Sequence, residues 1–177
     1  TVQIVSGADD INEANTTLTA GGATLWLGNG GTTTTSFTGL RFNNVTLPPR
    51  ATITSARLEV YSTQNQWISV SFQMAADAAD SSLPFTTANR PGLRTLTIAR
   101  VNHSSNASWA ANTWYSLDDI RALIQEVVNR ANWQSGNSLS IILKGAGGAW
   151  GRKFVSSFDG SPANAPKLVI TYTTGGA

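Results

Sequence analysis

Short stretches in which apolar and polar residues alternate recur along the whole chain. In residues 68–74 the alternation is strict: Ile68, Val70, Phe72 and Met74 would face a core, and the residues between them would face solvent. Breaks rich in glycine, threonine, proline or asparagine separate these stretches, so each predicts one β-strand. The predicted strands are 1–6, 25–27, 40–42, 56–61, 68–74, 94–101, 139–144, 152–158 and 167–173. Their number and spacing predict an all-β fold, a jelly-roll-like antiparallel β-sandwich.

One segment, residues 117–130, departs from this alternation. Its apolar residues recur at helical spacing, with charged and amide side chains on the other faces. Ser116 followed by Asp119 resembles a capping box with aspartate in place of glutamate. We therefore predict one short amphipathic helix that closes one side of the sandwich.

The length of 177 residues fits one domain, which we place at residues 1–173, with 174–177 as the start of a flexible linker. Only 12% of the residues are charged, and the net charge of +2 is spread without a basic run. This excludes nucleic acid as an expected partner. No apolar run reaches the roughly 18 residues of a membrane span. We expect a monomer that does not enter a membrane.

The aromatic inventory changes this picture more than the charge does. The chain has six tryptophans, one histidine and no cysteine. Tryptophan stacks on flat apolar faces, including those of sugar rings, whereas histidine and cysteine carry much acid–base, nucleophilic and metal chemistry. The composition therefore favours binding over catalysis.

Three tryptophans are predicted to face solvent. Trp26 lies between two core-facing leucines, and Trp67 shares parity with the outward residues of the next strand. Trp150 lies in the glycine-rich segment 147–151, expected to be a flexible hairpin tip, and the overlapping residues 145–148 are expected to form a hairpin turn. If they lie together, they would form a platform for pyranose rings. The side chains expected to add hydrogen bonds to sugar hydroxyls or a carboxylate are Tyr61, Gln73, Arg152 and Lys153.

Several segments, in their order along the chain, carry a family likeness. They are residues 9–13, 40–42, 51–58, 123–130, 133–137 and 159–172. Through them the sequence resembles the DNRLRE-type and related carbohydrate-binding-like modules of bacterial extracellular proteins. The resemblance implies a non-catalytic, secreted sandwich attached to a catalytic domain and often credited with polysaccharide binding. It also places aromatics at Trp109, Trp114 and Trp133, which we read as core or helix-packing residues.

A run of oxygen-bearing side chains near the start of the chain is the candidate metal site. Asp9, Asp10, Asn12 and Glu13 offer the hard ligands that calcium prefers, so Ca²⁺ is a candidate structural ion, although the function requires no cofactor. The alternative is a turn or capping cluster bonded to local amides. Residues that would complete a calcium site from elsewhere are Asp159 or the pair Asp77 and Asp80.

Catalytic groups are scarce. The best constellation is Glu59, predicted to point outward near Arg57 and Tyr61 on one strand. His103 lies in residues 101–105, expected to be a polar loop, without a serine motif or metal-ligand spacing, and we expect a solvated surface imidazole.

These observations lead to a hypothesis with two alternatives. The leading hypothesis is a non-catalytic carbohydrate-binding module that stacks a polysaccharide on exposed tryptophans and targets an attached secreted enzyme to its substrate. The second is a structural or adhesive spacer without a sugar site. The third is a small jelly-roll glycosidase or polysaccharide lyase.

Overall fold

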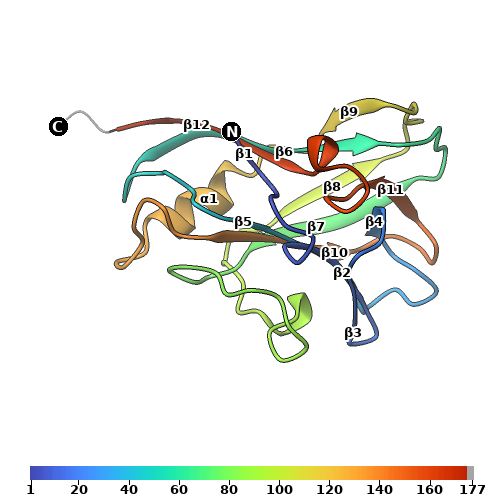
Figure 1. Cartoon of the computed structure of the whole chain (residues 1–177), viewed down its shortest axis with the longest axis horizontal. Helices are drawn as coiled ribbons and strands as arrows, with labels where there is room; N and C mark the ends of the chain where they lie inside the picture. Colours follow the sequence, from blue (N-terminus) through green and yellow to red (C-terminus); the bar gives the residue numbers. More distant parts are fainter. Residues whose placement is uncertain (175–177) are drawn as a thin grey trace.

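The computed structural model describes residues 1–174, in which two antiparallel β-sheets pack face to face (Figure 1). The four-stranded sheet has the order β1 (Val2–Gln3), β12 (Lys167–Thr173), β6 (Thr52–Ser62) and β9 (Thr113–Ser116). The six-stranded sheet has the order β3 (Thr17–Thr19), β2 (Asp10–Ala14), β5 (Ser36–Phe42), β10 (Leu139–Gly145), β7 (Val70–Ala76) and β8 (Val101–Ser105). The predicted antiparallel β-sandwich is confirmed.

A separate pair of strands, β4 (Thr24–Gly28) and β11 (Arg152–Ser156), joins the two sheets at one end of the sandwich. It lies at the right of Figure 1. Residues 146–151 connect β10 to β11, which pairs with β4 and not with β10. This segment is therefore a crossover between sheets, and the predicted hairpin turn is wrong.

The core fills the space between the two sheets with alternate residues of each strand. On β10, Leu139, Ile141 and Leu143 face inward, and they meet alternate residues of β6 across the core. Trp109 and Trp133 are buried here, as predicted, and the indole Nε1 of Trp133 donates a hydrogen bond to a backbone carbonyl at 2.9 Å.

The single α-helix in residues 1–174, α1 (Arg121–Val128), packs its apolar face on β6 and β7 and begins later than predicted. The amides of Leu117 and Ile120 donate to carbonyls of β6, so residues 117–120 continue along that strand. The Ser116 capping box does not form. Instead, Asp119 Oδ1 accepts from the amide of Arg121 at 2.8 Å, which stabilises the first turn.

The segment 77–98, which includes the short 3₁₀ helix η1 (Pro91–Leu93), covers part of the outer face of the six-stranded sheet (Figure 1). There Phe85 packs with Ile11 and Ile142. A side chain at Gly39 would meet the Phe85 ring at 2.7 Å, so glycine permits this close cover. Residues 94–100 form no strand, which corrects the prediction for 94–101.

Four strands were not predicted: β2, β3, β8 and β9. The strand β8 contains His103, which is 8% exposed and stacks on Phe72 with ring centres 5.1 Å apart. The surface imidazole expected at this position is therefore wrong. A second 3₁₀ helix, η2 (Pro162–Asn164), precedes β12. Of the predicted linker 174–177, residues 175–177 lie outside the described part of the chain.

Candidate functional site

Arg152 lies between two tryptophan rings at the β4–β11 end of the sandwich. Its guanidinium carbon is 4.6 Å from the ring centre of Trp26 and 5.2 Å from that of Trp150. Its Nε donates to the carbonyl of Asn29 at 2.7 Å. Burial lowers the pKa of Arg152, but a guanidinium stays charged at neutral pH. The three side chains therefore form a cation–π stack.

Trp26 supports this stack and does not offer a free ring. It points away from the core, as the alternation predicts, but it is half-buried. Its Nε1 donates to Ser36 Oγ at 2.9 Å, and Arg152 covers the ring. The predicted direction of Trp26 is therefore right, but the predicted exposure of its ring to solvent is too high.

Trp150 is the exposed member of the stack. It is 63% exposed and its backbone φ of 59° lies in the left-handed region that non-glycine residues seldom adopt. The Trp150 amide donates to the carbonyl of Gly30 at 2.8 Å. A side chain at Gly31 would stand 3.3 Å from the indole. The glycine pair therefore fixes the position of the ring while leaving most of it open to solvent.

A cavity of about 420 Å³ lies beside the Trp150 loop, between that loop and the ends of β7 and β8. Its walls are hydroxyl groups, an amide and glycine backbone. The Oγ atoms of Ser71 and Ser104 are 2.8 Å apart, and Gln73 Nε2 donates to Asn102 on the next pair of outward residues at 3.3 Å. The cavity is lined by Ser69, Val70, Ser71, Ser104, Ser105, Asn106, Gly147, Gly148 and Gly151.

The segment leading into this cavity carries Trp67, which is 71% exposed, as predicted. Ile68 is also exposed, because β7 begins only at Val70, so its predicted inward position is wrong. Lys153, expected to bind ligand, is 0% exposed. Its Nζ donates to the carbonyl of Ile68 and lies 5.4 Å from the ring centre of Trp109, and burial lowers its pKa. Lys153 thus anchors the Trp67 segment from inside.

Tyr61 lies on the outer face of the four-stranded sheet, whereas Gln73 lies on the outer face of the six-stranded sheet. The two cannot contact one ligand molecule at a single site, which corrects the predicted grouping. Tyr61 meets Trp114 edge to face at 5.3 Å, and Lys167 Nζ lies 4.1 Å from the Trp114 ring centre. Trp114 is therefore a half-buried surface residue and not a core residue.

The predicted calcium ligands of residues 9–13 do not converge: Asp9 precedes β2, the others lie along it, and the four side chains have separate partners. Asp9 pairs with Arg41 at 3.0 Å and Glu13 with Arg90 at 3.0 Å. Asn12 bonds through its side-chain amide to the backbone of β4. Within residues 1–174, no three His, Cys, Asp or Glu side chains come together as a metal site.

Asp10 is the member of this run that lacks a cationic partner. It is 1% exposed; its Oδ2 accepts from the amide of Phe158 at 2.7 Å, and its Oδ1 has no hydrogen-bond partner. Burial raises the pKa of Asp10 to about 7, and the like charges of Asp159 and Asp9 add to the rise.

Glu59, the candidate catalytic carboxylate, forms an ion pair with Arg57 on the outer face of the four-stranded sheet. Glu59 lies 3.1 Å from Arg57. It lines neither the cavity beside the Trp150 loop nor the cavity between β1, β12 and the segment 43–47. His103 Nδ1 lies 3.3 Å from Asp118, but without hydrogen-bond geometry. These contacts supply neither an opposed pair of carboxylates nor an oriented base.

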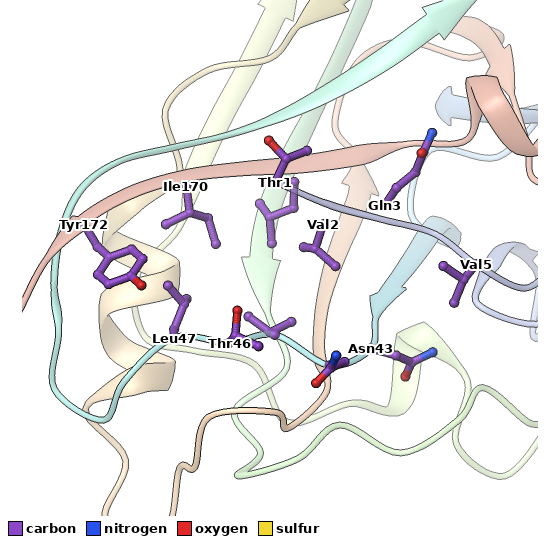
Figure 2. Close-up of a pocket in the computed structure, with 12 residues that line it drawn as sticks. Thr1, Val2, Gln3, Val5, Asn43, Thr46, Leu47, Ile170 and Tyr172 are labelled. Atoms are coloured by element: carbon purple, nitrogen blue, oxygen red, sulfur yellow. The ribbon is translucent and has the colours of Figure 1, made fainter.

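A second cavity, of about 440 Å³, opens between β1, β12 and the segment 43–47. Figure 2 shows Val2, Ile170, Tyr172 and Leu47 directed into it from above and below. None of the residues predicted to bind ligand lies here. Its apolar residues follow the ordinary strand pattern, so the sequence held no signal for this cavity.

Sequence reasoning found the exposed ring Trp150 but missed the hydroxyl groups beside it. The outward serines of 69–73 were predicted, but residues 102–105 were expected to be a loop. Only the pairing of Ser71 with Ser104 across β7 and β8 brings them together. That pairing is set by the tertiary fold.

Comparison with protein-family models and with curated proteins finds no match to this chain. The resemblance to DNRLRE-type modules therefore stays a prediction. Among residues 1–174, no helix has the length and apolar character needed to cross a membrane.

Proposed function

We propose that this protein is a non-catalytic glycan-binding module whose site is the Trp150 ring and the adjacent hydroxyl-lined cavity. The observation that carries the proposal is the exposed Trp150, fixed in a strained backbone conformation on an arginine stack. A rigid aromatic held open to solvent loses little conformational entropy when a sugar ring stacks on it.

The cavity beside Trp150 has the chemistry that would orient a sugar. Ser71, Ser104 and Asn106 offer donors and acceptors, and a hydroxyl can serve as either. Sugar hydroxyls need such partners because a buried polar group without one costs free energy. An aromatic ring for stacking and hydroxyl partners beside it match the apolar face and the hydroxyl-bearing edge of a pyranose.

Arg152 supports the same assignment. Its guanidinium lies over the rings of Trp26 and Trp150, and its Nε donates a hydrogen bond to the carbonyl of Asn29. It therefore positions Trp150 and leaves the exposed indole surface for ligand. Targeting of an attached secreted enzyme to its polysaccharide would follow from binding alone, through effective concentration.

Affinity electrophoresis tests this proposal. Native gels containing a neutral β-glucan, xylan, alginate or polygalacturonate are run with the wild type, Trp150→Ala and Trp114→Ala. We expect at least one polysaccharide to retard the wild type and Trp114→Ala, but not Trp150→Ala. Trp114 is the matched control because it is a half-buried tryptophan on the opposite sheet. Unretarded wild type on all four gels contradicts the proposal and favours the spacer.

A further inference from the structure

We infer that Asp10 and Asp159 bind one Ca²⁺ ion, which would tie the start of β2 to the loop after β11. The inference is independent of glycan binding. It rests on a buried oxygen of Asp10 without a partner and on the carboxylate of Asp159, which follows the residue whose amide bonds to Asp10.

Asp10 provides the first ligand. Its carboxylate is 1% exposed, and its Oδ1 has neither solvent nor a hydrogen-bond partner within residues 1–174. A buried charge without a partner is strongly unfavourable, and natural interiors pair such charges with a cation or a metal. The other acidic residues of this run, Asp9 and Glu13, each have an arginine, so Asp10 is the exception.

Asp159 provides the second ligand. Phe158, which donates its amide to Asp10, is its neighbour in sequence, and the charge of Asp159 acts on Asp10. The Asp159 carboxylate rests on Gly7: a Cβ added there would lie 2.4 Å from Oδ2 and 2.5 Å from Oδ1. Glycine at position 7 thus leaves room for the carboxylate beside the loop that leads into Asp10.

The donor set points to calcium. Both side chains are hard oxygen ligands, and Ca²⁺ accepts six to eight oxygens, including backbone carbonyls and water, in flexible geometry. The two carboxylates would be the only protein side-chain anions of the site, because no group of three metal-binding side chains occurs in residues 1–174. Backbone carbonyl oxygens and water would complete the shell.

The test measures Ca²⁺ binding and thermal unfolding at pH 7.5 on the whole chain. Isothermal titration with CaCl₂ is expected to give one ion per chain, with an affinity in the range of roughly 10⁻⁴ to 10⁻³ M typical of extracellular modules. Saturating Ca²⁺ is expected to raise Tm by about 5 °C relative to EDTA. Asp10→Asn and Asp159→Asn should each lose this shift, and Asp118→Asn, a matched exposed aspartate, should retain it.

Three outcomes overturn the inference. The first is a wild type whose Tm does not change between EDTA and 10 mM CaCl₂, taken roughly ten times above that affinity range. The second is an equal Ca²⁺ response in Asp10→Asn. The third is an equal response in Asp159→Asn, whose exposed loop position allows it to fold even where Asp10→Asn does not. In the first case Asp10 is a buried carboxyl group that holds no metal ion.

Discussion

The outer face of the six-stranded sheet has two halves that differ in what lies over them. Over β2, β5 and β10, the segment 77–98 covers the sheet and buries Phe85 against Ile142. Its polar groups are paired: Arg94 lies 2.7 Å from Asp77 and bonds to three backbone carbonyls. Within residues 1–174, no such segment lies over β7 and β8, and the outward serine and amide side chains contact one another and open into a cavity.

The strands alone therefore do not decide which part of the sheet a ligand can reach. Both halves belong to one sheet with one inner core. The covered half uses its polar residues to hold a loop, whereas the open half keeps them in contact with solvent. The Trp150 loop rises beside the open half, which is why we place glycan binding there.

The largest expected effect is on the covered half. Arg94→Met would leave Asp77 buried without its charge partner, and breaking a buried pair in this way costs roughly 3–5 kcal/mol. Urea unfolding should show this loss. Arg57→Met is the control, because that pair is partly exposed and should cost less than about 1 kcal/mol. Equal losses in the two variants would contradict the buried role of Arg94.

The second effect concerns Asp10, the acidic residue of β2 that has no cationic partner within residues 1–174. Its folded pKa of about 7 lies above the ordinary 3.8, so the folded state binds the proton more tightly. In EDTA, stability should therefore fall as the pH rises from about 4 to 7, by at most about 4 kcal/mol, and stay low above pH 7. Urea unfolding across this range should show a flatter profile for Asp10→Asn. Parallel profiles would contradict an uncompensated Asp10.

The third effect concerns glycan binding at the open half. Trp150→Ala should weaken binding of a retained glycan by about 2 kcal/mol, or roughly 30-fold in Kd, because a central aromatic anchor is lost. Isothermal titration measures the change. Tm should stay near that of the wild type, since the ring is mostly exposed. A large drop in Tm with unchanged Kd would make Trp150 a packing residue.

The smallest effect is at the cavity wall. Ser104→Ala removes one hydroxyl that faces Ser71 and should weaken glycan binding by about 1 kcal/mol, roughly fivefold. Ser55→Ala on the four-stranded sheet is the matched control, and the same titration should show no change for it. Equal affinities for wild type and Ser104→Ala would remove the cavity from the site.

The sequence predicts the sandwich well because most strands alternate between a core face and a solvent face. The prediction fails where an alternating pattern does not form a strand, or where a strand does not have one core face and one solvent face. Residues 94–101 alternate, but Leu96 packs against the outer cluster and Ile98 faces solvent, so the pattern marks a half-buried loop. Strand β2 was missed because its polar side chains, Asp10, Asn12 and Glu13, are buried within the protein and not exposed to water.

The candidate site was predictable only in part. Parity placed Trp26 away from the core, and glycine-rich context placed Trp150 at the surface. Their common contact with Arg152 depends on the pairing of β4 with β11, strands far apart in sequence. Lys153, the next residue, has the opposite parity and is buried, so charge alone was a misleading guide to exposure.

The indole N–H resonances of the six tryptophans report whether a sugar binds at Trp150. The ¹⁵N-labelled wild type is titrated with oligosaccharides of the neutral and acidic polysaccharides named above, and each resonance is assigned with single variants. We predict that the Trp150 signal moves most, the partly covered Trp26 less, and those of Trp114 and buried Trp133 not at all. Movement of Trp114 with Trp150 unchanged, or no movement with any sugar, would contradict a glycan site on the open half.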